Sequence, residues 1–366
     1  AGFQVVELDS PEMSKVAAGS LIIRDDMLIS DNFLDQLKSA IANRKKNYQC
    51  AIDFSRFQMF SPKDPAPCFR LLAIYYLGEK KSENQLEEIR WESLNIVPEV
   101  VHEIDQGIPS RMHNIEALRV YILDQYAIEV NFWFDLQTAT SLYSREFVAK
   151  MVLPASKILP GFVMKKIMTT SWIMEKGNII GKNCKIHPTA VLEGCIVGDN
   201  VEIGPFSYLR SSVLGDNVSL REKSAVKLSY LGRGAFVMGS DIVNCYIGDE
   251  SSIFTPLLYN VVFGEKSFLS GGSGFADFNI GGGDISVTIK GKKVKTGLNF
   301  LGSCVGDNCF LGANLIFSAG QAIPDGTRIL DNGLVKSVPV ECNGTYIVSD
   351  NKCIQIPNSF LGAAIS

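Results

Sequence analysis

Histidine and tryptophan are scarce in this 366-residue sequence, with three residues of each. The nine cysteines include no CxxC pair, so a structural zinc site would be short of ligands, and we expect reduced thiols in a cytoplasmic protein. No apolar run approaches the roughly 20 residues that a membrane-spanning helix needs. No charged-then-apolar leader opens the chain, so we expect neither a membrane span nor a secretory signal. The net charge of −4 argues against a general nucleic-acid binder.

Glycine is nearly absent from one half of the chain. Residues 1–176 hold five of the 32 glycines and all three tryptophans, and the other 27 glycines lie in residues 177–366. With 46% hydrophobic and 20% charged residues, a disordered chain is excluded, and the length allows two or three domains. The predicted divisions are an α/β domain over residues 1–152, a linker or cap over 153–177, a repeat domain over 178–340 and a C-terminal tail over 341–366.

The glycine-rich half carries an internal repeat. Pairs of an apolar residue and glycine recur at spacings of 17, 17, 17, 16 and 16 residues, and apolar residues recur about every six residues between them. The pairs are Ile180-Gly181, Val197-Gly198, Leu214-Gly215, Leu231-Gly232, Ile247-Gly248 and Phe263-Gly264. Three short strands of about six residues form one triangular coil with one aliphatic side chain pointing inward on each side, and such coils must stack to bury it. The pattern predicts a β-helical solenoid.

The corners of such a coil need residues that accept a positive φ or bond to their own backbone. Three phrases fit that need: Gly198-Asp199-Asn200, Gly215-Asp216-Asn217 and Gly306-Asp307-Asn308. The repeat is interrupted over residues 279–298, which predicts a loop excursion out of the solenoid.

With these repeats, the sequence resembles the hexapeptide-repeat transferases, whose domain is a left-handed parallel β-helix. The closest likeness is to the acetyltransferase domain of the bifunctional uridyltransferase/acetyltransferases that make UDP-N-acetylglucosamine. Residues 203–210, IGPFSYLR, match that family's IGPxxxLR segment, and Ala225-Val-Lys227 with Tyr230-Leu-Gly232 matches its next coil. The resemblance implies a homotrimer, an acyl-CoA donor and a sugar-phosphate or nucleotide-sugar ligand.

The resemblance also implies roles for individual residues. Arg210 and Lys227 occupy positions that contact the sugar phosphate in the family, although they can equally be solvated residues of an outer face. Asn279 sits where the family has an asparagine at the acyl-carrier site. The family's catalytic histidine falls at Met238 or Gly239 here, and neither can accept a proton, so the base is unknown.

The glycine-poor half alternates strand and helix patterns, which predicts an α/β domain with a mostly parallel sheet. We expect strands at Leu21–Ile29, Cys50–Phe54 and Asn114–Asp124, a strand or buried helix at Phe69–Leu77, and helices after Ser30 and over Phe132–Met151. The part around Asp25-Asp26 and Glu129-Val-Asn131 resembles the sugar-phosphate nucleotidyltransferases. That resemblance implies that Asp26 and Asn131 share a Mg²⁺ ion, while the alternative is that both residues only end strands and cap helices.

One feature of the nucleotidyltransferases is missing. They open with a Gly-rich loop of type GxGTRM, whose backbone N–H groups hold the triphosphate, and nothing in residues 1–60 matches it. Either the nucleotide-binding segment has been lost, or the sequence is a fragment.

Two further segments carry positive charge. Lys290, Lys292, Lys293 and Lys295 on the predicted excursion can attract a phosphate or a coenzyme, or form a solvated hairpin tip, which is the favoured interpretation. Residues 158–174 mix lysines with apolar side chains, and we expect them to dock on the first coil rather than on a membrane surface.

Three functions remain open on this sequence. The leading interpretation is a divergent, degenerate nucleotidyltransferase/hexapeptide transferase that binds a nucleotide sugar or sugar phosphate, with a truncated nucleotidyltransferase-like domain. The alternatives are a non-catalytic sensor or scaffold that retains the fold, and a sugar acyltransferase with a base other than the family histidine. Whether the protein is an enzyme is undecided, with a transferase favoured.

Overall fold

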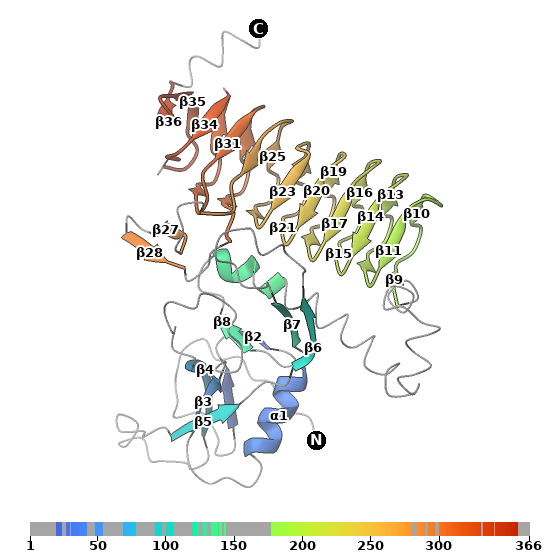
Figure 1. The fold of residues 1–366 in the computed structure, drawn as a ribbon, viewed down its shortest axis with the longest axis vertical. Coiled ribbons are helices and arrows are strands. Elements are labelled where there is room, and N and C mark those ends of the chain that lie inside the picture. The colour runs from blue at the N-terminus through green and yellow to red at the C-terminus, as the bar shows by residue number, and fades with distance from the viewer. Residues whose placement is uncertain are drawn as a thin grey trace. The chain divides into compact units, whose positions relative to one another are not determined.

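The computed structural model describes 18 separate stretches of the chain. They are residues 20–23, 27–29, 31–41, 48–53, 69–77, 92–96, 100–105, 119–123, 127–129, 133–137, 139–140, 143, 177–279, 284–289, 292–296, 300–330, 332–339 and 341–357. The chain divides into two compact units, residues 1–100 with 124–131, and residues 101–123 with 132–366. Figure 1 shows the described helices and strands of both units.

The first unit contains a four-stranded sheet in the order β1-β4-β3-β5, a separate pair of strands, β2 and β8, and helix α1 (Asp31–Ile41). Phe33, Leu37 and Ile41 of α1 are buried, spaced four residues apart as an amphipathic helix requires. The strands are β1 Ser20–Ile23, β2 Met27–Ile29, β3 Tyr48–Asp53, β4 Phe69–Leu77, β5 Glu92–Ile96 and β8 Ala127–Glu129.

The prediction of a mostly parallel sheet is wrong for this sheet. Strand β4 pairs antiparallel with both β1 and β3, and only β3 and β5 pair in parallel. The predicted strand Leu21–Ile29 is two strands, β1 and β2, which belong to different sheets. The error has a physical cause, because a buried strand appears as an apolar run whichever direction its neighbours take.

The second unit is dominated by a solenoid of short parallel strands whose three stacked sheets form the faces of a left-handed β-helix (Figure 1). The first face is β9 Ile179–Ile180, β12 Ile196–Val197, β15 Val213–Leu214, β18 Tyr230–Leu231, β21 Tyr246–Ile247, β24 Val262–Phe263, β29 Cys304–Val305 and β32 Ala322–Ile323. The second face is β10 Lys185–Ile186, β13 Glu202–Ile203, β16 Ser219–Leu220, β19 Phe236–Val237, β22 Ser252–Ile253, β25 Phe268–Leu269, β30 Phe310–Leu311, β33 Arg328–Ile329, β35 Thr345–Ser349 and β36 Lys352–Gln355.

The third face is built in two sections. Its lower section is β11 Val191–Glu193, β14 Tyr208–Arg210, β17 Ala225–Lys227, β20 Asp241–Val243 and β23 Leu257–Tyr259, and its upper section is β26 Gly274–Phe275, β31 Leu315–Phe317 and β34 Gly333–Val335. Each strand of the lower section pairs with the residues one coil further along, 16 or 17 positions away. The predicted period is therefore the coil length of the structure.

The interior of the β-helix is a stack of apolar side chains, as the hexad pattern predicts. Beyond the first coil, the inward aliphatic residues are almost fully buried; Val197, Ile203 and Leu209 of one coil are at most 2% exposed. Small hydroxyl residues fill the interior near the corners, where each side chain bonds to a backbone carbonyl. Ser212 Oγ, for example, donates to the carbonyl oxygen of Val226. These bonds satisfy buried polar groups that would otherwise cost stability.

The Gly-Asp-Asn corners are explained by contacts between coils. The Asn residues take the positive φ, 58° at Asn200 and 61° at Asn217. The Asp carboxylate accepts the backbone N–H of the neighbouring coil, as in Asp199 N–H to Asp216 Oδ1 at 2.7 Å. A Cβ on Gly198 would lie 2.5 Å from that same Oδ1, so glycine is required by close approach rather than by its φ.

The chain leaves the β-helix between β26 and β29. Strand β24 pairs with β29, so Val262 is opposite Cys304 rather than a residue 16 or 17 positions away. The intervening residues include an antiparallel hairpin, β27 Ser286–Ile289 and β28 Lys292–Lys295. In the same unit, β6 Val100–Asp105 and β7 Arg119–Leu123 form a two-stranded sheet, and residues 133–137, 139–140 and 143 are helical.

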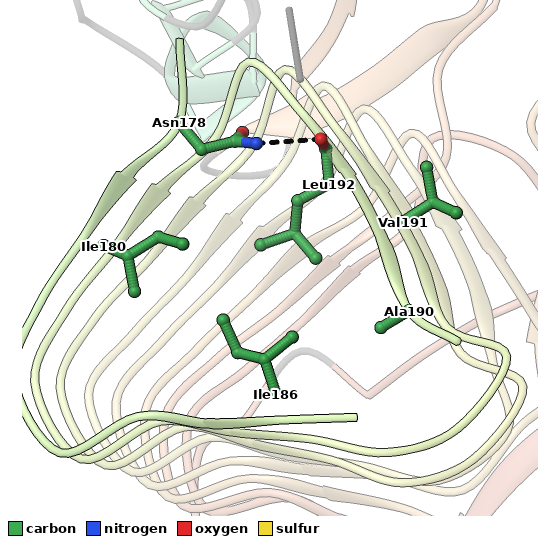
Figure 2. Close-up of a pocket in the computed structure, with 6 residues that line it drawn as sticks. All are labelled: Asn178, Ile180, Ile186, Ala190, Val191 and Leu192. Carbon is green, nitrogen blue, oxygen red and sulfur yellow. Dashed lines mark hydrogen bonds between the residues drawn. The ribbon is translucent and has the colours of Figure 1, made fainter. Parts of the chain in front are cut away.

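The first coil lies at one end of the stack of described coils. Figure 2 shows Ile180, Ile186 and Leu192 pointing into the triangle from its three sides, around a hollow of about 260 Å³. Asn178 Nδ2 donates to the carbonyl oxygen of Leu192 at 2.8 Å and ties two sides of this coil together. Ile180 remains 48% exposed because no described residue covers it from below. Of the predicted linker or cap, residues 153–177, all but residue 177 lie outside the described residues.

Candidate functional site on the third face

Arg210 and Lys227 lie side by side on the third face of the β-helix. Arg210 ends β14 and Lys227 ends β17, and the two residues are direct partners in the parallel pairing of these strands. They alternate with inward residues Leu209 and Val226, which are fully buried, so their side chains point outward. The structure therefore brings together the two cations that the sequence predicted as a pair on neighbouring coils.

Each of these cations is paired with a carboxylate. Arg210 Nε lies 3.6 Å from Glu193 Oε2, and Lys227 Nζ lies 3.0 Å from Asp241 Oδ1. Glu193 is the direct strand partner of Arg210 in the preceding coil. Asp241 lies in the coil after Lys227, where it is the direct partner of Ala225 rather than of Lys227. We call Glu193, Arg210, Lys227 and Asp241 the charge quartet; with two charges of each sign, it is neutral overall.

Two tyrosines complete the hydrogen bonding of these carboxylates. Tyr208 donates its hydroxyl to Glu193 Oε2 at 2.7 Å, and Tyr259 donates to Asp241 Oδ2 at 2.9 Å. Burial, together with the bond to Glu193, raises the pKa of Tyr208. Burial and the bond to Asp241 raise the pKa of Tyr259 to about 12. Both hydroxyls therefore stay protonated at neutral pH and remain hydrogen-bond donors.

The two carboxylates differ in their access to solvent. The Glu193 side chain is 8% exposed, whereas that of Asp241 is 32% exposed. A buried carboxylate needs partners, and Glu193 has them in Tyr208 and Arg210. Asp241 is the carboxylate of the quartet that an arriving ligand can reach.

Sequence reasoning missed Glu193, Asp241 and both tyrosines, although the repeat contained the signal. Glu193, Arg210 and Lys227 are spaced by 17 residues and occupy the same position of successive coils. Listing the outward residues of each coil would have put Glu193 beside Arg210. The carboxylates neutralise Arg210 and Lys227, so these two cations cannot bind a dianion without competing with their own acidic partners.

Asn279 follows a strand of the third face that lies beyond the charge quartet along the β-helix axis. Strand β26, which precedes it, is four coils beyond Arg210 of β14 and two coils beyond Asp241 of β20, or about 19 and about 10 Å at roughly 4.8 Å per coil. Asn279 is half-buried and engaged in a contact with the protein. Its predicted role at an acyl-carrier site stays a prediction.

The positions that replace the family histidine lie at the edge of the second face. Met238 follows β19 and is 45% exposed, and Gly239 takes a φ of 61° at the next corner. His187, at the corresponding corner of the first coil, accepts the backbone N–H of Thr189 at Nδ1 at 3.2 Å. That bond stabilises a turn.

The predicted metal ligands Asp26 and Asn131 lie outside the described residues. Within the described part of the chain, no group of three or more His, Cys, Asp or Glu side chains is placed to hold a metal ion. Whether Asp26 and Asn131 share a Mg²⁺ ion therefore stays a prediction. In the same part of the chain, no helix has the length and apolarity to cross a membrane.

Comparison with known proteins identifies the repeats. Residues 179–211 match the family model of the bacterial transferase hexapeptide (six repeats), so this part of the chain carries hexapeptide repeats. No curated protein sequence matches the chain. The family match does not include residues 1–152, whose likeness to nucleotidyltransferases stays a prediction.

Several experimental structures are similar to part of the chain. A UDP-N-acetylglucosamine acyltransferase from Bacteroides fragilis is 18% identical over 50% of this chain and 75% of its own, with a TM-score of 0.27. A polysialic acid O-acetyltransferase is 15% identical over 49% and 86%, with a TM-score of 0.22. An N-acyltransferase from Bacillus cereus, in complex with dTDP-4-amino-4,6-dideoxyglucose and coenzyme A, is 16% identical over 56% and 97%, with a TM-score of 0.21.

Proposed function

We propose that the β-helix is a sugar acyltransferase that holds its acceptor substrate on the charge quartet of the third face. The observation that supports this most strongly is the in-register pair Arg210 and Lys227, flanked by two carboxylates with tyrosine hydroxyls. The hexapeptide repeats of residues 179–211, which occur in bacterial transferases, support the reaction class.

The quartet offers complementary groups to a sugar derivative. Arg210 and Lys227 donate charge-assisted hydrogen bonds to a phosphate or to ring hydroxyls. Asp241 accepts a hydrogen bond from a hydroxyl or amino group, and it is already oriented by Tyr259. A phosphate on Lys227 would compete with Asp241 for the ammonium group, which would leave the carboxylate free to take a proton.

In the proposed reaction, Asp241 is the base that replaces the missing histidine. The acceptor nitrogen or oxygen attacks the thioester carbonyl of an acyl-CoA, and its proton passes to Asp241. The new acyl bond forms as the carbon–sulfur bond breaks, and the thiolate leaves and is protonated from solvent. The acyl donor supplies both the transferred acyl group and the leaving thiolate, so the reaction needs no oxidant, reductant or other co-substrate.

The test is thiol release from acetyl-CoA with a panel of amino sugars, sugar phosphates and nucleotide sugars. Asp241→Asn keeps the shape of the side chain, and we expect kcat to fall by about 10²–10⁴, the usual cost of losing a general base. Arg210→Ala and Lys227→Ala should raise KM for the acceptor. Lys185→Ala, an exposed cation in the first coil of the second face, is the matched control and should leave both constants unchanged.

Full activity in Asp241→Asn would remove Asp241 as the base. Full activity in the double variant Arg210→Ala/Lys227→Ala would remove the whole assignment of the acceptor site.

A second candidate is a non-catalytic protein that binds a sugar phosphate or nucleotide sugar. It is favoured by Met238 and Gly239, which stand where the family has its base. Thermal-shift screening of the same panel separates the two candidates, because this one requires binding without thiol release. Nucleotidyl transfer through Asp26 and Asn131 is a third proposal, and release of pyrophosphate from a nucleoside triphosphate would test it.

A further inference from the structure

The hairpin of β27 and β28 has one apolar face and one polar face. Val287 is opposite Val294 in the antiparallel pairing, and Val287 is fully buried. The neighbouring pairs, Ser286 with Lys295 and Thr288 with Lys293, are exposed. Because side chains alternate along a strand, these four residues share the opposite face of the hairpin. We call them the lysine–hydroxyl face.

The apolar side of the hairpin is anchored to the rest of the unit. Val287 belongs to a buried cluster with Phe134, Ile285 and Leu301. The approach is close, since a Cβ on Gly320 would lie 2.8 Å from Ile285 Cγ2. Thr296 Oγ1 also donates to the carbonyl oxygen of Ile285 at 2.7 Å and fixes the base of the hairpin. The lysine–hydroxyl face is therefore presented by a positioned element, outside the stacked coils (Figure 1).

Four cations of the β-helix are neutralised by carboxylates, whereas the two lysines of this face are not, within the part of the chain that the structure describes. Arg210, Arg221, Lys227 and Arg233 each lie within 4 Å of a carboxylate. Among the described residues, neither Lys293 nor Lys295 has an acidic partner. Two unneutralised cations on one small face attract anions.

We propose that the lysine–hydroxyl face binds the diphosphate group of a nucleotide-type ligand. Residues two apart on a strand are about 6.8 Å apart, and directly opposite residues are about 5 Å apart, so the four side chains surround one small area. Two ammonium groups and two hydroxyls supply donors on every side of that area. Lysine acts as a flexible point charge toward phosphate, which suits a face open to solvent.

The diphosphate has two possible sources, the acyl-CoA donor and a nucleotide-sugar acceptor. The binding experiment separates them without any turnover, so its result does not depend on the proposed acyl transfer. Isothermal titration at low salt is carried out on the full chain with pyrophosphate, then with ADP (adenosine 5′-diphosphate) and CoA for the donor, and with UDP for the acceptor.

The key variant is Lys293→Ala/Lys295→Ala, in which only exposed side chains are removed. We expect wild-type affinity for pyrophosphate to fall steeply with added salt, and the double variant to bind at least about tenfold more weakly. Lys352→Ala is the matched control, because Lys352 is also exposed and faces a hydroxyl residue, Ser349, across a hairpin. The hairpin of Lys352 has no second lysine–hydroxyl pair, so Lys352→Ala should leave the affinity for pyrophosphate unchanged.

A second control, Arg210→Ala/Lys227→Ala, tests whether the phosphate binds on the charge quartet instead. Weakening by this variant with no effect of Lys293→Ala/Lys295→Ala would overturn the proposal, since the phosphate would then lie on the charge quartet. Absence of binding by the wild-type chain to all four probes would overturn it as well. Tighter binding of CoA than of UDP, lost in the hairpin variant, would assign the face to the donor, and the reverse order would assign it to the acceptor.

Discussion

At the scale of single residues, the corners show how one coil constrains the residue types of the next. Asp216 accepts the backbone N–H of Asp199, and its carboxylate fills the space where a side chain on residue 198 would begin. Asn200 takes the left-handed conformation that most residues avoid. The phrase Gly-Asp-Asn thus meets three separate demands at one corner, and the two demands that come from the neighbouring coil were not evident from the sequence.

The first prediction concerns this corner. Gly198→Ala should lower the free energy of unfolding by about 1–3 kcal/mol, because the new Cβ would lie 2.5 Å from Asp216 Oδ1 and the coils must shift. Gly274→Ala is the control, since nothing lies within 4 Å of the place its Cβ would take and the cost should be small. Urea unfolding of both variants measures the difference. Equal stabilities would show that the corner has room for a methyl group.

At the scale of secondary-structure elements, alternation along a short strand decides which residues form the core and which form the site. In β23, Leu258 is 1% exposed and Leu257, its neighbour, is 54% exposed. The same alternation places Arg210 and Lys227 outside, and Lys293 and Lys295 on the free face of their hairpin. The element scale is also where the prediction failed in the first unit, because the apolar pattern of β4 does not reveal that both of its neighbours run antiparallel to it.

The second prediction uses these two neighbouring leucines. Leu258→Ala should cost about 2–5 kcal/mol of stability, because it removes a buried side chain and leaves a cavity in the stack. Leu257→Ala removes the same atoms from an exposed position and should change the stability by less than about 0.5 kcal/mol. Thermal unfolding followed by circular dichroism compares them. A similar loss in both variants would contradict the inward and outward assignment.

At the scale of the whole molecule, the second face is polar in its first coils and carries exposed aromatic side chains in its later coils. Phe236, Phe254, Phe268 and Phe310 form a ladder with ring centroids 5.4, 5.3 and 4.8 Å apart. Phe310 and Met238 are 44% and 45% exposed. We propose that this ladder lies in the interface of the predicted homotrimer, because contiguous exposed apolar surface marks contact sites.

The third prediction tests that proposal. Phe268→Ser/Phe310→Ser should shift the protein from trimer to monomer, since it removes the most exposed end of the ladder from the interface. Val191→Ser changes an apolar residue of similar exposure, 41%, on another face and should leave the trimer intact. Light scattering coupled to size-exclusion chromatography measures the mass of each. A wild-type monomer at micromolar concentration would refute the trimer.

Much of the β-helix was accessible from the sequence alone, since its coil length, inward residues and corners depend on spacings of six and 16–17 residues that the sequence displays directly. Contacts between outward side chains, such as that of Asp241 with Lys227, could not be predicted from the sequence, because they depend on which outward residues of neighbouring coils lie side by side. The same holds for the sheet of the first unit, where pairing joins segments far apart in the chain. Local periodicity encodes burial, whereas strand direction and the neutralisation of charge arise only when distant residues meet in space.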